Sequence, residues 1–281
     1  MENKVFKATA IGSRADIQAG VDISKVHGGY FSSAENARVF CEVGIQKIEN
    51  DLPREMSYVD FGGGQGFLAD LVSKYLEQLG HLVKVEVVDG NEGYLKVAGE
   101  IGLSTRLGNL ELVEYNDIDL VTMRAVLHYN LPSVQQEIVK NIYRALNPGG
   151  YFVHQLSAAR SKANNQLRAD LVNIPALGRD GSGSYNWISE NDAVKLHELA
   201  GFSETMVVGE APGGSWGPLS QWERFNAGKG DEGRKAQYLR EAQAVIDDYR
   251  AKYSDEETGL EKLADGSFVV HYEYPILVSR K

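Results

Sequence analysis

Residues 59–70 read VDFGGGQGFLAD, in which an apolar stretch runs into a glycine turn and a helical pattern follows. Gly62, Gly64 and Gly66 permit positive φ angles and carry no side chain that would keep a ligand away from the main chain. In open α/β sheets, a strand, a glycine turn and a helix in this order hold nucleotides at the carboxyl end of the strand. The stretch therefore predicts that a nucleotide-type cofactor lies on this turn.

The spacing of the glycines narrows the choice of cofactor. Phe67 stands where the third glycine of a dinucleotide-binding GxGxxG would fall, and no Lys follows Gly66 as a phosphate-binding loop requires. The turn instead resembles motif I of the class I S-adenosylmethionine-dependent methyltransferases, an acidic residue followed by GxGxG. The matching residues are Asp60, Gly62, Gly64 and Gly66. A plain glycine connector is the alternative, so support has to come from further along the chain.

The next strand pattern, VEVVDG, ends in an acidic residue that resembles the second motif of the same superfamily. The resemblance makes Asp89, with Gly90 beside it, the ligand of the two ribose hydroxyls. A carboxylate accepts such hydrogen bonds about twice as strongly as a neutral group does. The alternative is that Asp89 only caps the turn before Gly90.

Three further stretches resemble the superfamily in the correct order. In RLGNLEL, Asn109 and Leu110 resemble the segment that meets adenine; an Asp is commoner than Asn there, but the amide oxygen can also accept from the exocyclic amine. In DIDLVTMRAVLHY, Met123 and Arg124 would lie near the methionine part of the cofactor, where Arg124 would pair with a carboxylate unless it is a surface arginine. Residues 145–154, ALNPGGYFVH, resemble the turn into the fifth strand.

Periodicity along the chain predicts alternating strands and helices. Strands are expected at 58–61, 83–89, 104–107, 118–123, 151–155, 205–208 and 268–278, and helices at 33–50, 66–80, 93–100, 133–146, 189–200 and 231–253. This order predicts a Rossmann-like, doubly wound α/β fold with a seven-stranded, mostly parallel sheet and an antiparallel last strand. We expect one methyltransferase domain over 1–281, with a helical N-terminal cap at 1–50 and an insertion at 212–267 before the last strand.

Composition limits the partners and cofactors. The formal net charge of -10 disfavours a nucleic-acid surface, so a small-molecule substrate is expected. Cys41 is the only cysteine, which excludes an internal disulfide and a cysteine-rich metal site and favours a buried thiol. Asp117 and Asp119 lie at the start of their strand, away from its carboxyl end, so no catalytic metal is expected. No apolar run resembles a signal peptide or a membrane span, which predicts a cytoplasmic location without a membrane partner.

The acceptor side of the site is harder to read from sequence. His128 and His154 follow or end the fourth and fifth strands, so either is a candidate general base, with a structural histidine as the alternative for each. Tyr30 and Phe31 precede the cap helix, and Trp187 precedes the helix at 189–200. These three aromatic residues are candidates for contact with substrate, and the alternative is that they pack in the core.

The resemblance implies an enzyme that uses S-adenosylmethionine to methylate an oxygen or nitrogen of a small molecule, in a biosynthetic reaction. Such a transfer depends mainly on alignment, which is worth roughly 7 to 11 kcal/mol. Methylation of a peptide, a protein or RNA is one alternative, and binding of S-adenosylmethionine without transfer is another. A nicotinamide oxidoreductase is disfavoured by Phe67.

Overall fold

A computed structural model describes residues 33–178, 185–226 and 231–281. Within these ranges one mixed sheet has the strand order β3-β2-β1-β4-β5-β8-β6, and a short β7 pairs with β8. The strands are β1 Glu55–Phe61, β2 Leu82–Asp89, β3 Ser104–Leu107, β4 Ile118–Arg124, β5 Leu146–Gln155, β6 Glu204–Trp216, β7 Leu260–Lys262 and β8 Phe268–Arg280. Strands β1 to β5 are parallel, and β8 is antiparallel to both β5 and β6. The predicted fold class is confirmed, with β7 as an addition.

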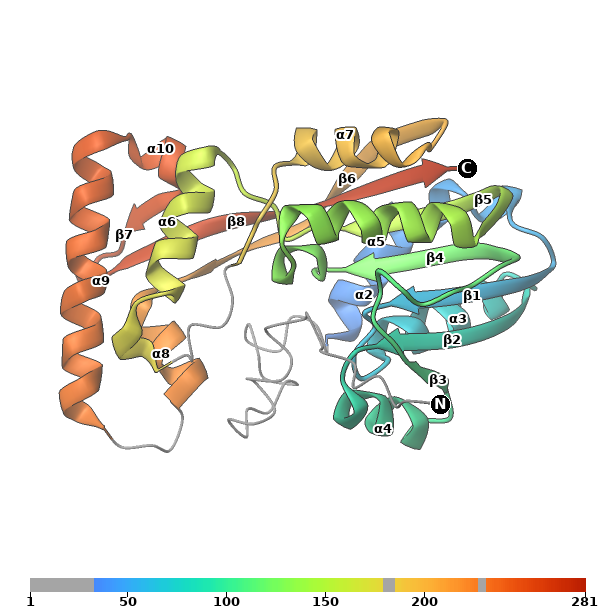
Figure 1. Ribbon diagram of the computed structural model, residues 1–281, viewed down its shortest axis with the longest axis horizontal. Helices are drawn as coiled ribbons and strands as arrows, with labels where there is room; N and C mark the ends of the chain where they lie inside the picture. The colour runs from blue at the N-terminus through green and yellow to red at the C-terminus, as the bar shows by residue number, and fades with distance from the viewer. Residues whose placement is uncertain (1–32, 179–184, 227–230) are drawn as a thin grey trace.

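Helices cover both faces of this sheet (Figure 1). They are α2 Ala34–Val43, α3 Phe67–Gln78, α4 Glu92–Glu100, α5 Pro132–Ala145, α6 Lys162–Val172, α7 Glu190–Ala200, α8 Pro218–Asn226, α9 Glu232–Lys252 and α10 Asp255–Thr258. The helix expected at 33–50 ends earlier, because two 3₁₀ turns, Ile45–Lys47 and Glu49–Asp51, follow α2. None of the helices in the described ranges is long and apolar enough to cross a membrane.

Neighbouring residues of β1 show how the two faces are divided. Tyr58 packs in a core cluster with Val72 of α3, whereas Val59 packs in a second cluster with Ile138 of α5. Successive side chains of a strand point to opposite faces, so α3 and α5 lie on opposite sides of the sheet. A parallel sheet needs helices on both faces, so neither face is free for a ligand. Ligands bind such sheets at the edge formed by the carboxyl ends of the strands.

Strand β6 is much longer than the predicted stretch 205–208. It continues to Trp216 through register shifts between Val207 and Gly209 and between Ala211 and Gly214. Glycines permit the irregular backbone of such bulges, so a sequence that resembles a loop continues as a bulged strand. Both β6 and β8 are 13 residues long and run beyond the parallel strands.

A group of helices packs around the outer ends of β6 and β8 (Figure 1). We call this group, made of α6, α8, α9, α10 and β7, the helical lobe. All but α6 lie wholly within residues 212–267, the segment predicted as an insertion, and α6 follows β5. Helix α9 buries Tyr238, Ala242, Ile246 and Tyr249 and contacts both α6 and α8. The carboxyl end of β4 points toward the helical lobe, so this edge of the sheet faces the junction between the two parts.

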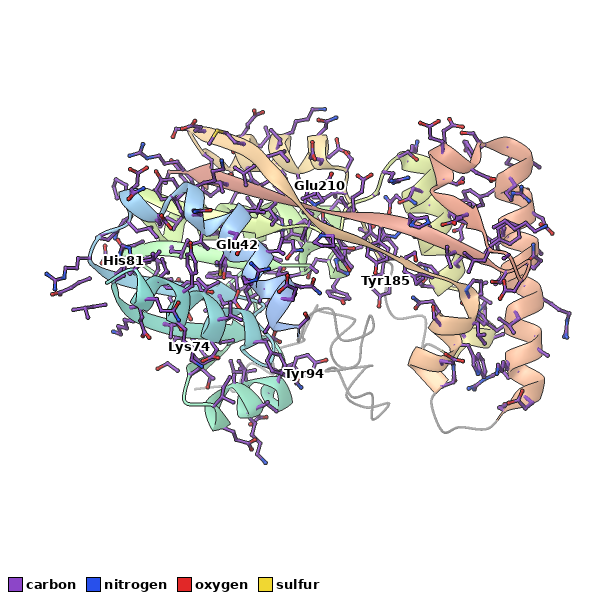
Figure 2. The ribbon with its side chains drawn as sticks, turned by 180° about the vertical axis from the view of Figure 1, so that it is seen from behind. Glu42, Lys74, His81, Tyr94, Tyr185 and Glu210 are labelled. Carbon is purple, nitrogen blue, oxygen red and sulfur yellow. The ribbon has the colours of Figure 1, made fainter. Side chains whose placement is uncertain are left out.

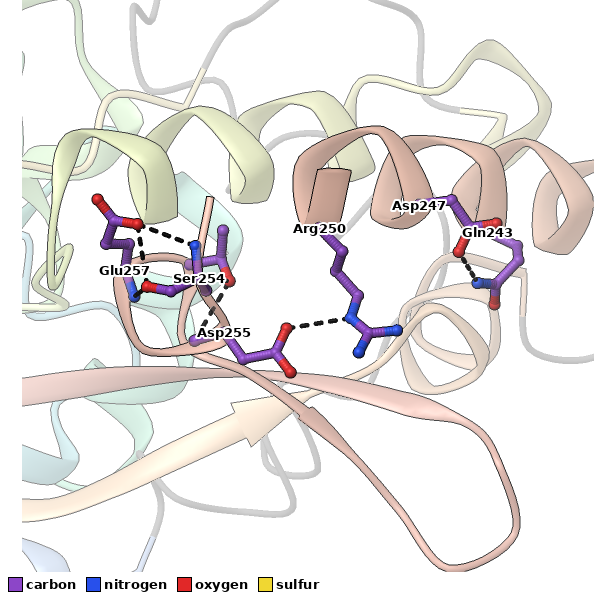
Figure 3. A network of polar contacts seen from close by, with 7 residues as sticks. Gln243, Asp247, Arg250, Ser254, Asp255 and Glu257 are labelled. Carbon is purple, nitrogen blue, oxygen red and sulfur yellow. Dashed lines mark hydrogen bonds and ion pairs between the residues drawn. The ribbon is translucent and has the colours of Figure 1, made fainter. Parts of the chain in front are cut away.

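Polar contacts define the turn at the end of α9 (Figure 3). The Arg250 Nε donates to Asp255 Oδ1 at 3.0 Å, and Ser254 and Glu257 form a reciprocal capping box at the start of α10. Capping satisfies backbone N–H groups that a helix start leaves without intrahelical partners. The chain therefore reverses direction here and returns toward β7 and β8.

Candidate functional site

The turn after β1 requires glycine for two reasons. Gly62, Gly64 and Gly66 have φ angles of 72°, 55° and 81°, which residues with a side chain rarely adopt. A Cβ on Gly62 would also lie 2.6 Å from the side chain of Val126, which follows β4. The Gly62 N–H donates to the Val88 carbonyl oxygen at 2.7 Å, which ties the turn to the end of β2. Motif I is therefore a fixed loop at the carboxyl edge of the sheet.

One side of this loop is open to a ligand. Of the residues that the structure describes, only Tyr94 would lie within 4 Å of a Cβ on Gly64, with its ring at 3.8 Å. Tyr94 lies in the first turn of α4, at the position labelled in Figure 2. A ligand can thus approach the Gly64 backbone between the loop and this ring.

Asp89 joins the glycine loop to the start of α4. Its Oδ2 accepts from the Gly64 N–H at 3.1 Å and its Oδ1 accepts from the Asn91 N–H at 2.8 Å. The residue is 8% exposed, and burial raises the pKa of its carboxyl to about 6. Each oxygen can accept more than one hydrogen bond, so the carboxylate can also bind the hydroxyls of a ribose. Gly90 follows it, and within the described part of the chain only the Gly108 carbonyl oxygen lies near its Cβ position, at 3.8 Å.

Asp60 lies beneath the same loop. Its Oδ1 accepts from Thr122 Oγ1 at 2.7 Å, and burial raises the pKa of its carboxyl to about 6. Its Oδ2 is buried and has no hydrogen-bond partner among the described residues. A Cβ on Gly63 would lie 2.5 Å from this oxygen, so only glycine at position 63 lets the loop pack this closely on the Asp60 carboxylate. The unpaired oxygen is an acceptor that a ligand on the loop can satisfy.

The two residues predicted to meet adenine are placed differently. The Asn109 side-chain amide donates to Glu111 Oε1 at 3.0 Å, which directs its carbonyl oxygen to accept from another donor. Leu110 is buried in the core cluster on the α5 side, and its carbonyl oxygen accepts from Asn141 at 2.9 Å. The position of Asn109 therefore suits a contact with a base, whereas the Leu110 side chain is held in the core.

Met123 and Arg124 at the end of β4 also differ. Met123 is wholly buried in the cluster on the α5 side, so its side chain lies in the core. The charge of Arg124 lowers the pKa of the Asp60 carboxyl, against the larger effect of burial. Burial raises the pKa of the Cys41 thiol to about 12, and the charge of Arg124 lowers it in part. Arg124 is the last residue of β4, two residues beyond Thr122, which lies beside Asp60 in the sheet, and Met123 contributes packing.

His128 and Trp187 are brought together at the junction with the helical lobe. His128 lies in a 3₁₀ turn, Leu127–Tyr129, after β4. Its ring stacks on that of Trp187 with centroids 5.6 Å apart and planes 9° apart, and Trp187 in turn stacks on Tyr185 at 4.9 Å. Figure 2 shows Tyr185 between the sheet and the helical lobe. These residues form an aromatic wall at the carboxyl edge of the sheet.

His154 is placed quite differently. It is wholly buried in β5, its Nδ1 lies 3.2 Å from Nε2 of His197, and Nδ1 of His197 lies 2.7 Å from Ser279 Oγ. Burial lowers the pKa of both imidazoles, that of His197 to about 3. Its neighbours in the core give His154 a packing role, so the geometry favours His128 over His154 as a general base.

A cavity lies behind the aromatic wall. It opens to solvent, and both the sheet edge and the helical lobe contribute to it. It is lined by His128, Tyr129, Ser157, Arg168, Val172, Tyr185, Trp187, Trp216, Gln221 and Tyr274. The predicted substrate residues Tyr30 and Phe31 lie outside the described residues. Of the described His, Cys, Asp and Glu residues, no three or more are grouped so as to hold a metal ion.

Arg168 and Gln221 are cavity residues that the sequence analysis did not identify. One signal for Arg168 is present, because it lies on a stripe with helical spacing whose other members, Asn164, Leu167 and Leu171, are also buried. An arginine on a buried stripe is unusual and marks a position to inspect. Gln221 in α8 has no comparable signal.

A family model described as "Methyltransferase domain" matches residues 33–204. No curated protein matches the sequence significantly. Among solved structures, the YcgJ protein from Bacillus subtilis has a TM-score of 0.63 and 15% identity, and the match covers 89% of this chain and 99% of that one. A putative methyltransferase from Bacillus halodurans C-125 has a TM-score of 0.62 and 19% identity, covering 87% and 98%.

A third structure contains ligands. It is phosphoethanolamine N-methyltransferase 2 from Haemonchus contortus, in complex with phosphomonomethylethanolamine and S-adenosylhomocysteine. Its TM-score is 0.53 and its identity 15%, and the match covers 95% of this chain but 57% of that one. Identities at this level establish a shared fold.

Proposed function

The chain belongs to the class I S-adenosylmethionine-dependent methyltransferases, and on this premise we propose that it methylates an oxygen or nitrogen atom of a small molecule. Bound S-adenosylmethionine supplies an electrophilic methyl group on a sulfonium sulfur. The chain's own residues then have to position the cofactor, position the acceptor and remove a proton where the acceptor carries one. A biosynthetic role, a cytoplasmic location and independence of metal are parts of the same proposal.

The observation that carries the cofactor side is the link between the glycine loop and Asp89. The hydrogen bonds from Gly64 and Asn91 fix the carboxylate next to the open side of the loop. We assign the ribose to Asp89, and we assign the main-chain contacts to the loop itself and to Gly90. Asp60 and Arg124 lie on the neighbouring strands β1 and β4, at the end that meets this loop, so we assign to them the charged methionine end of the cofactor.

The adenine end completes the proposed cofactor site. Asn109 has its carbonyl oxygen available to accept from the base, because its amide nitrogen donates to Glu111. Leu110 and Met123 are buried, and we propose that they support the site through the core, Leu110 at the adenine end and Met123 at the methionine end. The donor set of carboxylates, an arginine, an amide and bare backbone fits S-adenosylmethionine.

On the acceptor side, the support is the cavity at the sheet edge. His128 and the aromatic residues beside it line a cavity between the sheet and the helical lobe, and a cavity of this kind suits a small acceptor better than an extended chain. An imidazole at this place can remove the proton of a hydroxyl or an ammonium group at neutral pH. We therefore propose His128 as general base and Trp187 as a wall of the acceptor pocket.

The experiment is methyl transfer from labelled S-adenosylmethionine to a panel of small hydroxyl and amine acceptors. We expect a labelled small-molecule product, and we expect His128→Ala to slow turnover roughly 10²- to 10⁴-fold, the range for a general base. His81→Gln is a matched control, because His81 is half-buried and lies at the far end of the sheet from Tyr185 (Figure 2). His154→Ala should lower stability more than turnover.

Two results would contradict the proposal. One is labelling of peptides or RNA while every small acceptor remains unlabelled. The other is tight binding of S-adenosylmethionine with no transfer to any acceptor, which would favour a protein that uses the cofactor without methylating. If His128→Ala leaves turnover unchanged while transfer persists, catalysis rests on positioning alone and the assignment of a general base is wrong.

A further inference from the structure

Arg168 carries a charge inside the protein, and no acidic side chain of the described residues pairs with it. It is 1% exposed and lies in α6, where it lines the cavity between the sheet edge and the helical lobe. Its Nη1 donates to the Ala158 carbonyl oxygen at 2.7 Å and its Nη2 donates to Ser157 Oγ at 3.1 Å. Both partners are neutral, and its Nε has no hydrogen-bond partner among the described residues. The guanidinium is thus buried and only partly satisfied.

The aromatic rings around this group hold it without neutralising it. The guanidinium carbon lies 4.1 Å from the centroid of the Trp187 ring and 5.1 Å from that of the Tyr272 ring. Stacking on a ring stabilises a cation and fixes its plane, while the N–H edge stays available. Burial lowers the pKa of Arg168 to about 9, so the side chain still carries its proton at neutral pH. A buried cation is costly unless an anion compensates it.

The rest of the cavity has the character of a binding pocket for an acid. No Asp or Glu is present among the described residues that line it. Two further lining residues have a buried polar atom with no hydrogen-bond partner among the described residues. These atoms are the Gln221 Oε1 acceptor and the Trp187 Nε1 donor. Buried polar groups are normally satisfied, so three such groups around one cavity indicate a polar ligand.

We propose that Arg168 binds an oxyanion, a carboxylate or a phosphate, on the methyl acceptor, and so makes the enzyme selective for small acids with a planar apolar part. The aromatic walls enclose that planar part, and Gln221 Oε1 accepts a hydrogen bond from a hydroxyl or amine N–H that the acceptor molecule also carries. Arg168 and His128 line the same cavity from the helical lobe and the sheet edge, so an acid held at Arg168 extends toward the methyl-transfer edge. This inference rests on the proposed function, of which it specifies the substrate class.

Binding to the protein saturated with S-adenosylhomocysteine tests the inference without requiring methyl transfer. The probes are two matched pairs, benzoate with benzamide and phenyl phosphate with phenol, followed by tryptophan fluorescence because Trp187 lies in the cavity. For at least one pair we expect the acid to bind about tenfold more tightly than its neutral partner. The pair that shows the preference identifies the oxyanion as carboxylate or phosphate.

Variants then assign the preference to this residue. Arg168→Met should bring the acid and its neutral partner to nearly equal affinity, and Arg168→Lys should retain part of the preference because it keeps the charge but loses the planar fork. Arg160→Met is the matched control, since Arg160 is exposed and pairs with Glu273 outside the cavity. It should leave the ratio unchanged. If the methionine variant does not fold, the lysine variant still has to show a reduced ratio.

Several results would overturn the inference. These are equal binding of acid and neutral partner by the unaltered protein, no binding of either acid at millimolar concentration, or a preference that survives in both Arg168 variants. A large loss of S-adenosylhomocysteine affinity in Arg168→Met would also overturn it, by assigning the guanidinium to the cofactor carboxylate. If the protein prefers the acids but transfers no methyl group, the proposed function is wrong and the assignment of the oxyanion to Arg168 still stands.

Discussion

At the scale of single residues, Asp89 is oriented before any ligand binds. The N–H groups of Gly64 and Asn91 each donate to one of its oxygens, and burial raises the pKa of the carboxyl to about 6. A side chain held in this way does not have to be ordered on binding, so more of each new hydrogen bond appears as affinity. This makes Asp89 the residue at which the cofactor assignment is most directly tested.

We expect Asp89→Ala to weaken the binding of S-adenosylhomocysteine by roughly 1.5 to 3 kcal/mol, the range for hydrogen bonds to a charged group. Isothermal titration calorimetry measures this directly. Asp70→Ala is a suitable control, because Asp70 lies in the first turn of α3, close to the loop in sequence, but pairs with Lys74 at the surface. Unchanged affinity in Asp89→Ala would remove the ribose assignment.

The raised pKa values also predict how binding depends on pH. Ribose hydroxyls donate to an ionised carboxylate, so the proton on Asp89 competes with the ligand. Affinity should be full above about pH 7 and fall as the pH drops below about 6, and Asp60 acts in the same direction because its pKa is also about 6. Titrations from about pH 5 to about pH 8 measure this, and Asp89→Asn should flatten the curve. Affinity that rises toward low pH would contradict the assignment.

The residues of the site differ in how far the sequence predicts them. Asp60, the three glycines and Asp89 are readable because strand end, turn and ligand residue are adjacent in the chain. Arg168 and Gln221 become part of a site only when α6 and α8 meet the sheet edge. No local pattern encodes that meeting, because it depends on where β6 and β8 end.

At the scale of elements, strong periodicity predicts the central strands and helices, but it does not predict the full length of an irregular strand. Strand β6 contains Gly209 and the stretch APGG, which are typical of a loop, yet its bulges keep it paired with β8 through to Trp216. Helix α6 escapes for another reason, because Asn164 and Arg168 occupy its buried face and weaken the apolar pattern. The helical lobe is therefore the least predictable part of the fold.

The outer bulge of β6 gives a prediction of its own. A Cβ on Gly214 would lie 2.3 Å from the Tyr272 hydroxyl oxygen and 2.5 Å from its Cζ, and Tyr272 is buried against Arg168. We expect Gly214→Ala to lower the free energy of unfolding by about 1 to 3 kcal/mol, as overpacking does. Urea denaturation measures the change.

The matched control for that variant is Gly99→Ala in α4. No other described atom lies within 4 Å of a Cβ there, so the substitution should be neutral or stabilise by up to about 1 kcal/mol through helix propensity. If Gly214→Ala is as stable as the unaltered protein, the close contact between β6 and Tyr272 is wrong.

At the scale of the whole molecule, the two parts share a core. The cluster on the α3 side of the sheet contains Tyr58 and Val153 of the central strands. It also contains Trp216 at the end of β6 and Trp222 and Tyr249 of the helical lobe. A continuous apolar cluster of this kind couples the parts, since neither can open without exposing surface that the other covers. The junction that holds the proposed acceptor cavity is thus supported from both sides.

This shared core predicts that the chain unfolds as one unit. The chain has three tryptophans. Trp187 and Trp216 line the cavity and Trp222 lies in the helical lobe, whereas the proposed cofactor site lies on the sheet edge. We expect urea unfolding followed by tryptophan fluorescence and by far-ultraviolet circular dichroism to coincide. S-adenosylhomocysteine at a hundred times its Kd should then stabilise both signals equally, by about 2.7 kcal/mol.

Asp89→Ala provides the control, because at the same ligand concentration its weaker binding should shrink the shift in both signals together. A fluorescence transition that stays in place while the circular dichroism transition moves would show that the helical lobe unfolds independently. It would also contradict the prediction of a single domain over 1–281. Coincident shifts would mean that ligand bound at the glycine loop stabilises the walls of the acceptor cavity through the common core.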